Sequence, residues 1–291
     1  PLGDVRVQLD DHLTVREFCL RALDSGDLSD KLRPPRDAEG KLLPDETAGP
    51  PENRTRPARS PELSLSGGAD KLPRPGQLRD PEARARCLAR FAHHELMAVE
   101  LFAWALLRWP ELPGELRKLW LVTLEEEQLH CRLYLGRLAA HGSDLSAHTR
   151  SDYFWRQLPG IERSPHGPRA FLSAMGLTLE QANLDFTLVY RDGFREAGDE
   201  ESAQICQRVH DDEVSHVRRA SEWLMRLSRG DNEDPVAVYD ETVPFPLAAS
   251  RAKGRRFSVA SRRSAGLSEP FIEHVRTARS SQQLAGSSKP N

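Results

Sequence analysis

The stretch Glu125-Glu126-Glu127-Gln128-Leu129-His130 decides the fold, together with a second stretch, Asp212-Glu213-Val214-Ser215-His216. Each contains the pattern Glu-x-x-His inside a run with helical periodicity. Residues three apart lie on one face of a helix, so the Glu and the His of each pattern can reach the same point. Both pairs occupy positions that an amphipathic helix normally fills with Leu or Val. Because an unpaired buried charge is costly, a shared metal centre is the simplest explanation.

A single glutamate precedes each pattern at almost the same distance. Glu95 lies 32 residues before Glu127, and Glu180 lies 33 residues before Glu213. This spacing predicts two antiparallel helical hairpins, because facing residues in a hairpin are nearly equidistant from the turn. One Glu and one Glu-x-x-His from each hairpin make up the ligand set of ferritin-like di-iron and di-manganese bundles. The sequence therefore predicts an all-α, ferritin-like four-helix bundle in which a long crossover joins the two hairpins.

The predicted metal ligands are Glu95, Glu127, His130, Glu180, Glu213 and His216. Four ionised glutamates and two neutral imidazoles carry a charge of −4, which two divalent cations would neutralise. Oxygen and imidazole ligands suit iron or manganese, so the expected cofactors are two iron ions or a Mn/Fe pair. The alternative is that these residues form buried salt bridges or partly exposed helix faces. That alternative explains one pair more easily than two pairs with matching partners.

The composition of the chain limits the number of domains and the class of protein. The chain has 291 residues, a net charge of −3 and 38% hydrophobic residues, which allows one well-filled core with extensions or at most two domains. No apolar run approaches the ~18 residues of a membrane span, and no signal peptide is visible. The four cysteines form no Cys-x-x-Cys pattern. This favours reduced thiols in a cytoplasmic protein and removes a rubredoxin-type iron site.

Three segments are expected along the chain. Residues 1–79 contain a short helix and a Pro-rich stretch, which is either an ordered arm packed on the bundle or a flexible leader. Residues 80–230 form the metal-binding bundle. Residues 231–291 form an irregular basic C-terminal arm with one short helix over 268–279. The basic stretch of this arm is a nucleic-acid or anion patch or a solvated arm, and the scarcity of interleaved aromatic residues favours the solvated arm.

The bundle helices have recognisable boundaries. The expected ranges are 80–109 and 115–141 for the first hairpin, a third helix after the connection 142–168, and 199–230 for the fourth. The third helix is the least regular, because Gly176 interrupts it and Thr178 offers a cap for a fresh start. This predicts a break or kink near residues 176–178, with Glu180 in the first turn that follows.

Several polar residues near the ligands are candidates for hydrogen bonds that orient them, or for nearby helix contacts. They are His93, Glu100, Tyr134, Asn183, His210 and Asp212. Asn183 lies one turn from Glu180 and is expected to orient it. Tyr134 lies one turn beyond His130 and is either a core residue or a redox-active neighbour of the site. For His210, an exposed histidine is an equal alternative.

The three stretches 93–101, 126–130 and 212–217 together resemble a bacterial ferritin-like family known only as a domain of unknown function. The Pro-rich leader and the segment 243–247 are also similar to that family, so the resemblance covers most of the chain. This sequence departs from it in the third helix, where many relatives carry a glutamate near the position of Ser173. Here Glu180 is the nearest candidate. A more distant likeness is to the di-iron tRNA hydroxylase.

The resemblance to ferritin-like oxygenases implies an oxidase or hydroxylase that uses O₂ as a co-substrate and acts on a small molecule. No flavin or iron–sulfur motif is present, so electrons are expected from an external donor or from the substrate. Iron handling without catalysis is the alternative, although extended terminal arms disfavour a closely packed cage. A tRNA-modifying hydroxylase and a bundle that only binds its ligand are further alternatives. A homodimer is left open, while nucleic acid and membrane partners are not expected.

Overall fold

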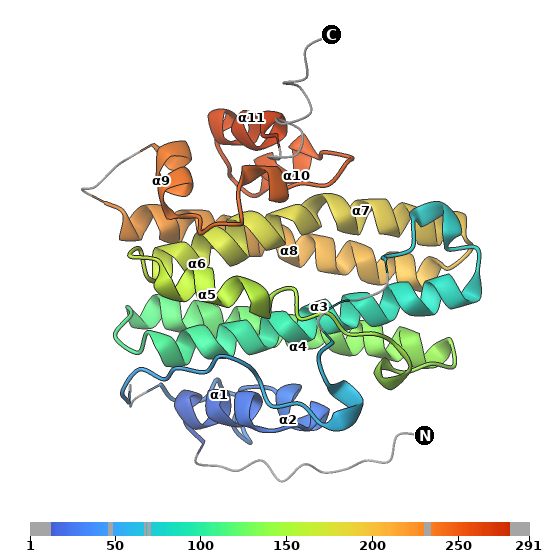
Figure 1. Cartoon of the computed structure of the whole chain (residues 1–291), viewed down its shortest axis with the longest axis horizontal. Coiled ribbons are helices and arrows are strands. Elements are labelled where there is room, and N and C mark those ends of the chain that lie inside the picture. The colour runs from blue at the N-terminus through green and yellow to red at the C-terminus, as the bar shows by residue number, and fades with distance from the viewer. Residues whose placement is uncertain (1–12, 46–48, 67, 69–70, 230–233, 280–291) are drawn as a thin grey trace.

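The computed structural model describes residues 13–45, 49–66, 68, 71–229 and 234–279, and over these residues the protein is all-α, without a β-strand. The helices are α1 (Val15–Asp24), α2 (Leu28–Lys31), α3 (Pro81–Arg108), α4 (Gly114–Ala140), α5 (Leu158–Arg163), α6 (Pro168–Ala174), α7 (Gln181–Glu196), α8 (Glu200–Leu227), α9 (Pro235–Thr242), α10 (Val259–Ser264) and α11 (Glu269–Thr277). The long helices α3, α4, α7 and α8 lie side by side (Figure 1). The N-terminal helices lie against α3 and α4, and the C-terminal helices lie on α7 and α8 (Figure 1).

The first helical pair is fixed by its start signal and its turn. The carboxylate of Asp80 accepts a hydrogen bond from the backbone N–H of Glu82, and Pro81 occupies the first helical position. Helix α3 ends at Arg108 and α4 begins at Gly114, so a short turn reverses the chain and the two helices run antiparallel. Helix α3 is buried on nearly all sides, because it packs against both α4 and α1.

Asp199 connects the two helical pairs. Its side chain accepts a hydrogen bond from the backbone N–H of Ser202 at 3.1 Å and so caps α8. The same carboxylate pairs with Arg137 at 2.9 Å and with His141 at 3.0 Å, at the end of α4. The start of α8 is therefore held beside the end of α4, and α4 and α8 pack against each other.

The third long helix is irregular where the sequence predicted a break or kink. The helix is not interrupted there, because α6 continues through a π-helical segment, Met175–Glu180, directly into α7, and Glu180 lies in this segment rather than in a turn after it. Thr178 does not cap a new helix, since its hydroxyl donates to the carbonyl of Ser173 at 2.7 Å. A Cβ added to Gly176 would lie 2.2 Å from the Cβ of Ala220 on α8. The wide π turn thus keeps the helix continuous while it passes very close to α8.

The Pro-rich N-terminal stretch follows a defined path over its described residues. Lys31 and Arg59 form buried ion pairs with Glu100 of α3, at 3.0 and 2.8 Å. The indole N–H of Trp155, in the connection between the helical pairs, donates to the same carboxylate at 3.0 Å. Lys31 and Arg59 thus attach the described part of this stretch to α3. Glu100 is the point where the arm and the connection meet α3.

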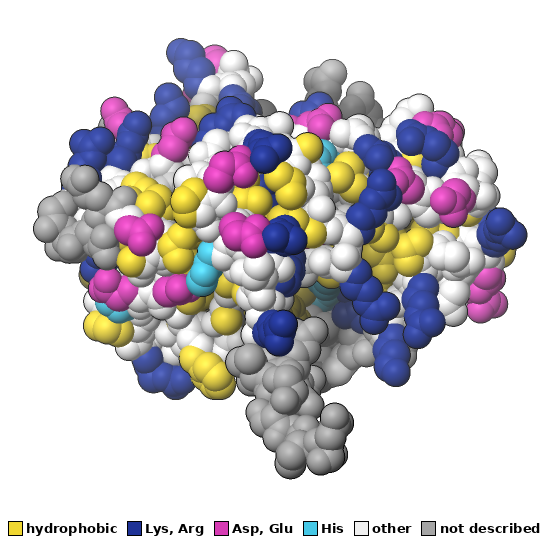
Figure 2. All heavy atoms as spheres, turned by 90° about the horizontal axis from the view of Figure 1, so that it is seen from above, with side chains coloured by type: hydrophobic (Ala, Val, Ile, Leu, Met, Phe, Trp, Pro, Cys, Tyr) yellow, Lys and Arg dark blue, Asp and Glu magenta, His cyan; other side chains and the backbone are white. Residues whose placement is uncertain are grey.

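The C-terminal segment is more regular than predicted. It contains α9, α10 and α11 where the sequence indicated one helix over 268–279, and the expected end of α8 at Gly230 lies outside the described residues. Basic and acidic side chains are interspersed on the face that carries these elements (Figure 2). Among the basic residues, Arg256 pairs with Asp192 and Arg263 pairs with Glu269.

The prediction of a solvated basic arm is wrong for Arg262. Both Arg262 and its partner Asp185 on α7 are fully buried, and the two side chains form an ion pair at 2.8 Å. Asp185 also accepts hydrogen bonds from the backbone N–H groups of Gly254 and Ser258, at 2.8 and 2.7 Å. The reason for the error is that a helix carboxylate far away in the sequence neutralises this arginine and organises the loop around it.

Among the described residues, no helix has both the length and the apolar character needed to cross a membrane.

The buried pair between Asp185 and Arg262 gives a stability prediction. We expect Asp185→Ala to lower the free energy of unfolding by about 3–5 kcal/mol, because it leaves a buried guanidinium without its counter-charge. Asp192→Ala is the matched control on the same helix, and its partly exposed ion pairs should be worth about 1 kcal/mol or less. Denaturant unfolding measures both values. Equal losses in the two variants would contradict the role assigned to Asp185.

Candidate metal centre

The structure brings together all six residues that the sequence proposed as ligands. Helix α4 carries Glu127 and His130, α8 carries Glu213 and His216, α3 carries Glu95, and the π-helical segment ends with Glu180. All six side chains are buried, and Glu95 and Glu180 are the most exposed, at 6% and 5%.

The potential ligand atoms form two groups of three. Inside each group, the three atoms lie within 4.8 Å of one another. One consists of Glu95, Glu127 and His130, and the other of Glu127, Glu180 and His216. Glu127 belongs to both groups, which is the arrangement expected of a carboxylate shared between two ions. Glu213 is outside both groups, although its Oε2 lies 3.7 Å from Nδ1 of His216.

Over the described residues, the atoms that converge on this point lack hydrogen-bond partners. Nδ1 of His216 is 3.1 Å from Oε1 of Glu127, and Nδ1 of His130 is 3.4 Å from its Oε2. None of these atoms has hydrogen-bond geometry, and Oε1 of Glu180 and Oε2 of Glu213 are also without a partner. Buried polar atoms are nearly always satisfied, so several orphaned atoms in one place need an explanation. A cation among them would satisfy oxygen and imidazole donors together, and this donor set suits iron or manganese.

The Nε2 atom of each histidine contacts an acidic side chain of the opposite helix. Nε2 of His130 on α4 lies 3.1 Å from Asp212 on α8, and Nε2 of His216 on α8 lies 2.9 Å from Glu126 on α4. An N–H at Nε2 that donates to a carboxylate leaves the lone pair of Nδ1 directed at the cluster. The two motifs thus support each other crosswise.

Asp212 was predicted as a neighbour of the site, whereas Glu126 was missed. The signal was present, since an acid directly precedes the Glu of both motifs. Arg208 holds Asp212 at 2.8 Å and Arg219 holds Glu126 at 2.7 Å, so each supporting acid is itself anchored by an arginine.

When no cation is bound, the pKa values of the clustered carboxylates are shifted from their ordinary value. Burial raises the pKa of Glu95, Glu180 and Glu213 above the ordinary value. Burial would also raise the pKa of Glu127, but its contacts with the two imidazoles outweigh this effect and lower its pKa. The metal-free cluster therefore retains protons that cations would displace.

The pKa values of His130 and His216 are raised, although burial alone would lower them. Burial favours the neutral form of His130, but the hydrogen bond to Asp212 and the contact with Glu127 raise its pKa to about 9. The acids around His216 raise its pKa well above the ordinary value, again against the effect of burial. In the metal-free protein, the positive charge of the protonated imidazoles therefore offsets negative charge of the carboxylates, as a bound cation would.

Two other predicted neighbours have different partners from those expected. Asn183 donates to Oε1 of Glu213 at 2.8 Å, and not to Glu180, because it lies on the α7 face toward α8. His210 does not contact a ligand. Its ring nitrogens lie 3.0 Å from the hydroxyl of Thr187 and 3.1 Å from that of Ser261, so it joins α7, α8 and α10.

Among the described residues, Glu100 and His93 form no hydrogen bond or ion pair with the proposed ligands. Glu100 is committed to the ion pairs of the N-terminal arm, because its carboxylate faces Lys31 and Arg59. His93 is buried, and within the described residues its ring nitrogens have no hydrogen-bond partner. Burial lowers the pKa of His93, so it stays neutral.

Tyr134 packs beside the site. Its ring lies 5.3 Å from that of Phe91, and its hydroxyl is 3.9 Å from Sγ of Cys206. The hydroxyl of Ser173 lies 2.6 Å from that of Thr242, so Ser173 takes no part in the cluster. The carboxylate on this helix comes instead from Glu180, at the end of the π-helical segment.

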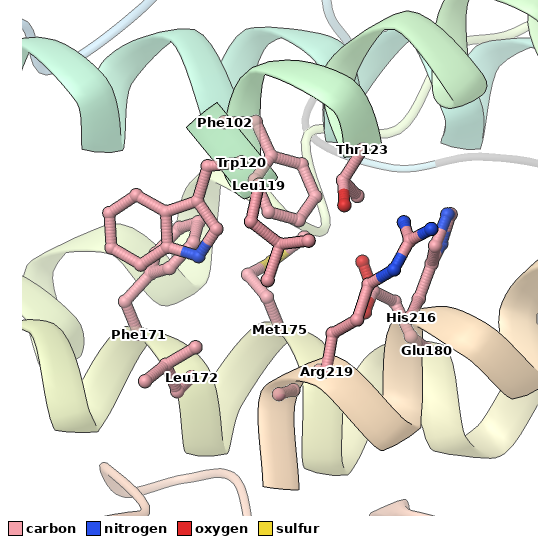
Figure 3. Close-up of a pocket in the computed structure, with 12 residues that line it drawn as sticks. Phe102, Leu119, Trp120, Thr123, Phe171, Leu172, Met175, Glu180, His216 and Arg219 are labelled. Atoms are coloured by element: carbon pink, nitrogen blue, oxygen red, sulfur yellow. The ribbon is translucent and has the colours of Figure 1, made fainter. Parts of the chain in front are cut away.

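Two cavities border the cluster on different sides. A small one of about 20 Å³ ends at Glu180 and His216 (Figure 3). Its other walls are mainly apolar, with Phe102, Trp120 and Met175 among them (Figure 3). A larger cavity of about 350 Å³ borders Glu95 and Asn183, and both helical pairs contribute to its walls.

Comparison with known proteins identified one family. The family model described as "Protein of unknown function (DUF455)" matches residues 24–273, which is most of the chain. No curated protein and no solved structure matched the sequence.

The shifted histidine gives a pH prediction for chelator-treated protein. The folded-state pKa of His130, about 9, exceeds its ordinary value of 6.5, so its stabilising contribution is present below pH 6.5 and is lost as the pH rises toward 9. The raised carboxyl pKa values act in the same direction above pH 4.5. We expect chelated protein to lose on the order of 2 kcal/mol of stability between pH 6.5 and 9.

Thermal unfolding across this pH range measures the loss. Asp212→Asn removes the acid that raises the pKa of His130, so its pH dependence should be shallower. The same slope in the wild type and in this variant would contradict the pairing of Asp212 with His130.

Proposed function

Because the chain belongs to the DUF455 family, whose description assigns no activity, we propose a function from the site itself. The protein is a ferritin-like four-helix bundle that binds two iron ions, or a Mn/Fe pair, and activates O₂ as an oxidase or hydroxylase of a small molecule. The observation that carries this proposal is the convergence of unpartnered ligand atoms from Glu127, His130, Glu180, Glu213 and His216.

The helix arrangement supports the fold part of the proposal. Helices α3 and α4 form one antiparallel pair and α7 and α8 form the other, with the long connection between α4 and α6 joining them. Each pair contributes one single glutamate and one Glu-x-x-His to the buried cluster. This ligand set, with these roles for the helices, is that of ferritin-like carboxylate proteins.

Reduced iron held by carboxylates and imidazoles would supply the oxygen chemistry. In a hydroxylation, one oxygen atom of O₂ enters a C–H bond of the substrate and the other becomes water. The reaction consumes two protons and two electrons, which an external electron donor supplies. In an oxidation, the substrate itself supplies electrons and protons.

The protein residues would hold the ligands and control access. Glu126 and Asp212 fix the two imidazoles, so the ligand nitrogens are oriented before a metal arrives. Glu180 is the last residue of the π-helical segment, where the helix hydrogen bonds are less regular, and is the ligand best placed to change its binding mode. The small cavity that ends at Glu180 has room for a diatomic molecule, with mainly apolar walls at one end and the polar side chains of His216 and Arg219 at the other (Figure 3).

Iron handling without catalysis is the second candidate. The larger cavity beside Glu95 favours an enzyme, because a protein that only stores or transfers iron does not need a pocket for an organic molecule. A tRNA-modifying role is weaker still, because Arg256, Arg262 and Arg263 are paired with acids of the same chain.

We expect protein from iron-supplemented cells to contain close to two metal ions per chain. The anaerobic ferrous protein should oxidise rapidly in O₂, with an absorbance change that reports ferric iron. Glu180→Ala should slow this reaction at least ~10-fold while the remaining ligands still hold metal. Metal analysis and stopped-flow absorbance measure both results.

The controls separate the candidate functions. A metal content near zero after reducing, chelator-free purification would exclude a metal protein. Ferrous protein that is inert to O₂, or a Glu180→Ala variant that reacts at the wild-type rate, would exclude oxygen activation at this site. Gel filtration of a cage-sized assembly would favour iron storage.

The crossed acid–histidine pairs give a second prediction. Glu126→Gln and Asp212→Asn should each weaken metal binding by about 10- to 100-fold, because they loosen the imidazole ligands. Glu125→Gln is the matched control, since Glu125 pairs with Arg36 of the N-terminal arm and not with a ligand. Titration with Mn²⁺ or Fe²⁺ under anaerobic conditions measures the affinities. Wild-type affinity in both variants would show that these acids do not support the site.

A further inference from the structure

A cavity of about 350 Å³ lies between α3 and α7 and borders the metal centre. Its volume is in the range of small-molecule sites. Glu95 and Asn183 place it directly beside the cluster, because Glu95 is a proposed ligand and Asn183 binds Glu213. Two segments from other parts of the chain complete its walls, one at Tyr153 and the other around Arg251.

The walls of the cavity are rich in aromatic rings. Phe91, Tyr134, Tyr153, Phe154 and Phe186 all contribute. Phe186 remains 41% exposed, which is unusual for a large apolar residue of this chain. Aromatic rings offer broad apolar contact area with few rotatable bonds, so they suit the apolar or aromatic body of an organic molecule.

Apart from the proposed ligand Glu95, the charged side chains that line the cavity are positive. Arg251 and Lys253 contribute to the walls, and Glu95 is the one acid among the lining residues. Glu95 is neutralised by the metal in the proposed function. The ammonium of Lys253 donates to the carbonyls of Arg276 and Ala278, so its hydrogen-bonding capacity is largely used within the chain.

Arg251 is different from Lys253. Over the described part of the chain its guanidinium has no hydrogen bond or ion pair, although the nearby Arg256, Arg262 and Arg263 are each paired with an acid. The short 3₁₀ turn at 249–251 places Arg251 at the cavity. A planar guanidinium beside an aromatic pocket is suited to a carboxylate or a phosphate.

We propose that this cavity binds an amphipathic organic anion. Its carboxylate or phosphate pairs with Arg251, and its apolar or aromatic body lies among the rings and extends toward Glu95. The inference rests on the proposed function for its catalytic meaning, since it names the substrate class of that site. The binding preference itself does not require oxygen chemistry.

The test uses probes of equal shape and different charge. Calorimetry on the full chain compares 4-phenylbutyrate with 4-phenylbutyramide and 4-phenylbutylamine, and adds 3-phenylpropylphosphonate to distinguish the two anionic head groups. We expect the anions to bind about tenfold more tightly than the amide, with the amine weakest. Arg251→Gln should weaken the binding of 4-phenylbutyrate by about five- to tenfold and leave the amide unchanged.

Charge reversal makes the test specific. Arg251→Glu should invert the preference, so that the amine binds more tightly than the carboxylate. Arg255→Glu is the matched control, because Arg255 is an exposed neighbour that does not line the cavity. Thermal unfolding checks that each variant is folded. Equal binding of the three probes, no binding at millimolar concentration, or an unchanged preference in Arg251→Glu would overturn the proposal.

The two proposals fail separately. Anion-selective binding by a protein whose ferrous form is inert to O₂ would leave the organic-anion site intact and remove the oxygenase. A ferrous protein that reacts with O₂ but binds all probes alike would do the reverse. Chelated protein should retain the anion preference, because Arg251 is not a metal ligand.

Discussion

The burial of four carboxylates and two imidazoles at the meeting point of α3, α4, α8 and the π-helical segment is the constraint on which the rest of the structure depends. Buried carboxylates repel one another strongly, so they persist only with protons or cations among them. Within the part of the chain that the structure describes, both oxygens of Glu127 and Nδ1 of His130 and His216 lack hydrogen bonds. This arrangement lowers the stability of the fold, and the surrounding packing must offset the loss.

The surrounding structure compensates by fixing each long helix from outside. Asp199 holds the start of α8 to the end of α4, and Glu100 ties α3 to the N-terminal arm and to the connection. Asp185 holds the C-terminal segment on α7 through Arg262. All three are carboxylates with several partners, and their bonds act between segments that are distant in the sequence. Such anchors keep the ligand-bearing faces together when no metal is bound.

Access to the cluster differs on its two sides. The small cavity meets Glu180, the last residue of the π-helical segment, and the aromatic cavity meets Glu95 on α3. In the proposed function, O₂ and an organic substrate would reach the cluster by these separate routes. Glu180, the proposed movable ligand, would then lie on the side of the gas and Glu95 on the side of the substrate.

The sequence by itself determined the helical class, the long helices and the six clustered residues, because the three-residue spacing of Glu and His and the matched distances of Glu95 and Glu180 are local and periodic properties. The tertiary structure alone decided which groups pair across helices. Asp212 supports His130, Glu126 supports His216, Asn183 binds Glu213, and Asp185 neutralises Arg262. It also decided the form of the irregularity predicted near residues 176–178, which is a continuous π turn at the point where Gly176 lies close to Ala220 of α8. Such pairings depend on distances between segments remote in the chain, which periodicity does not encode.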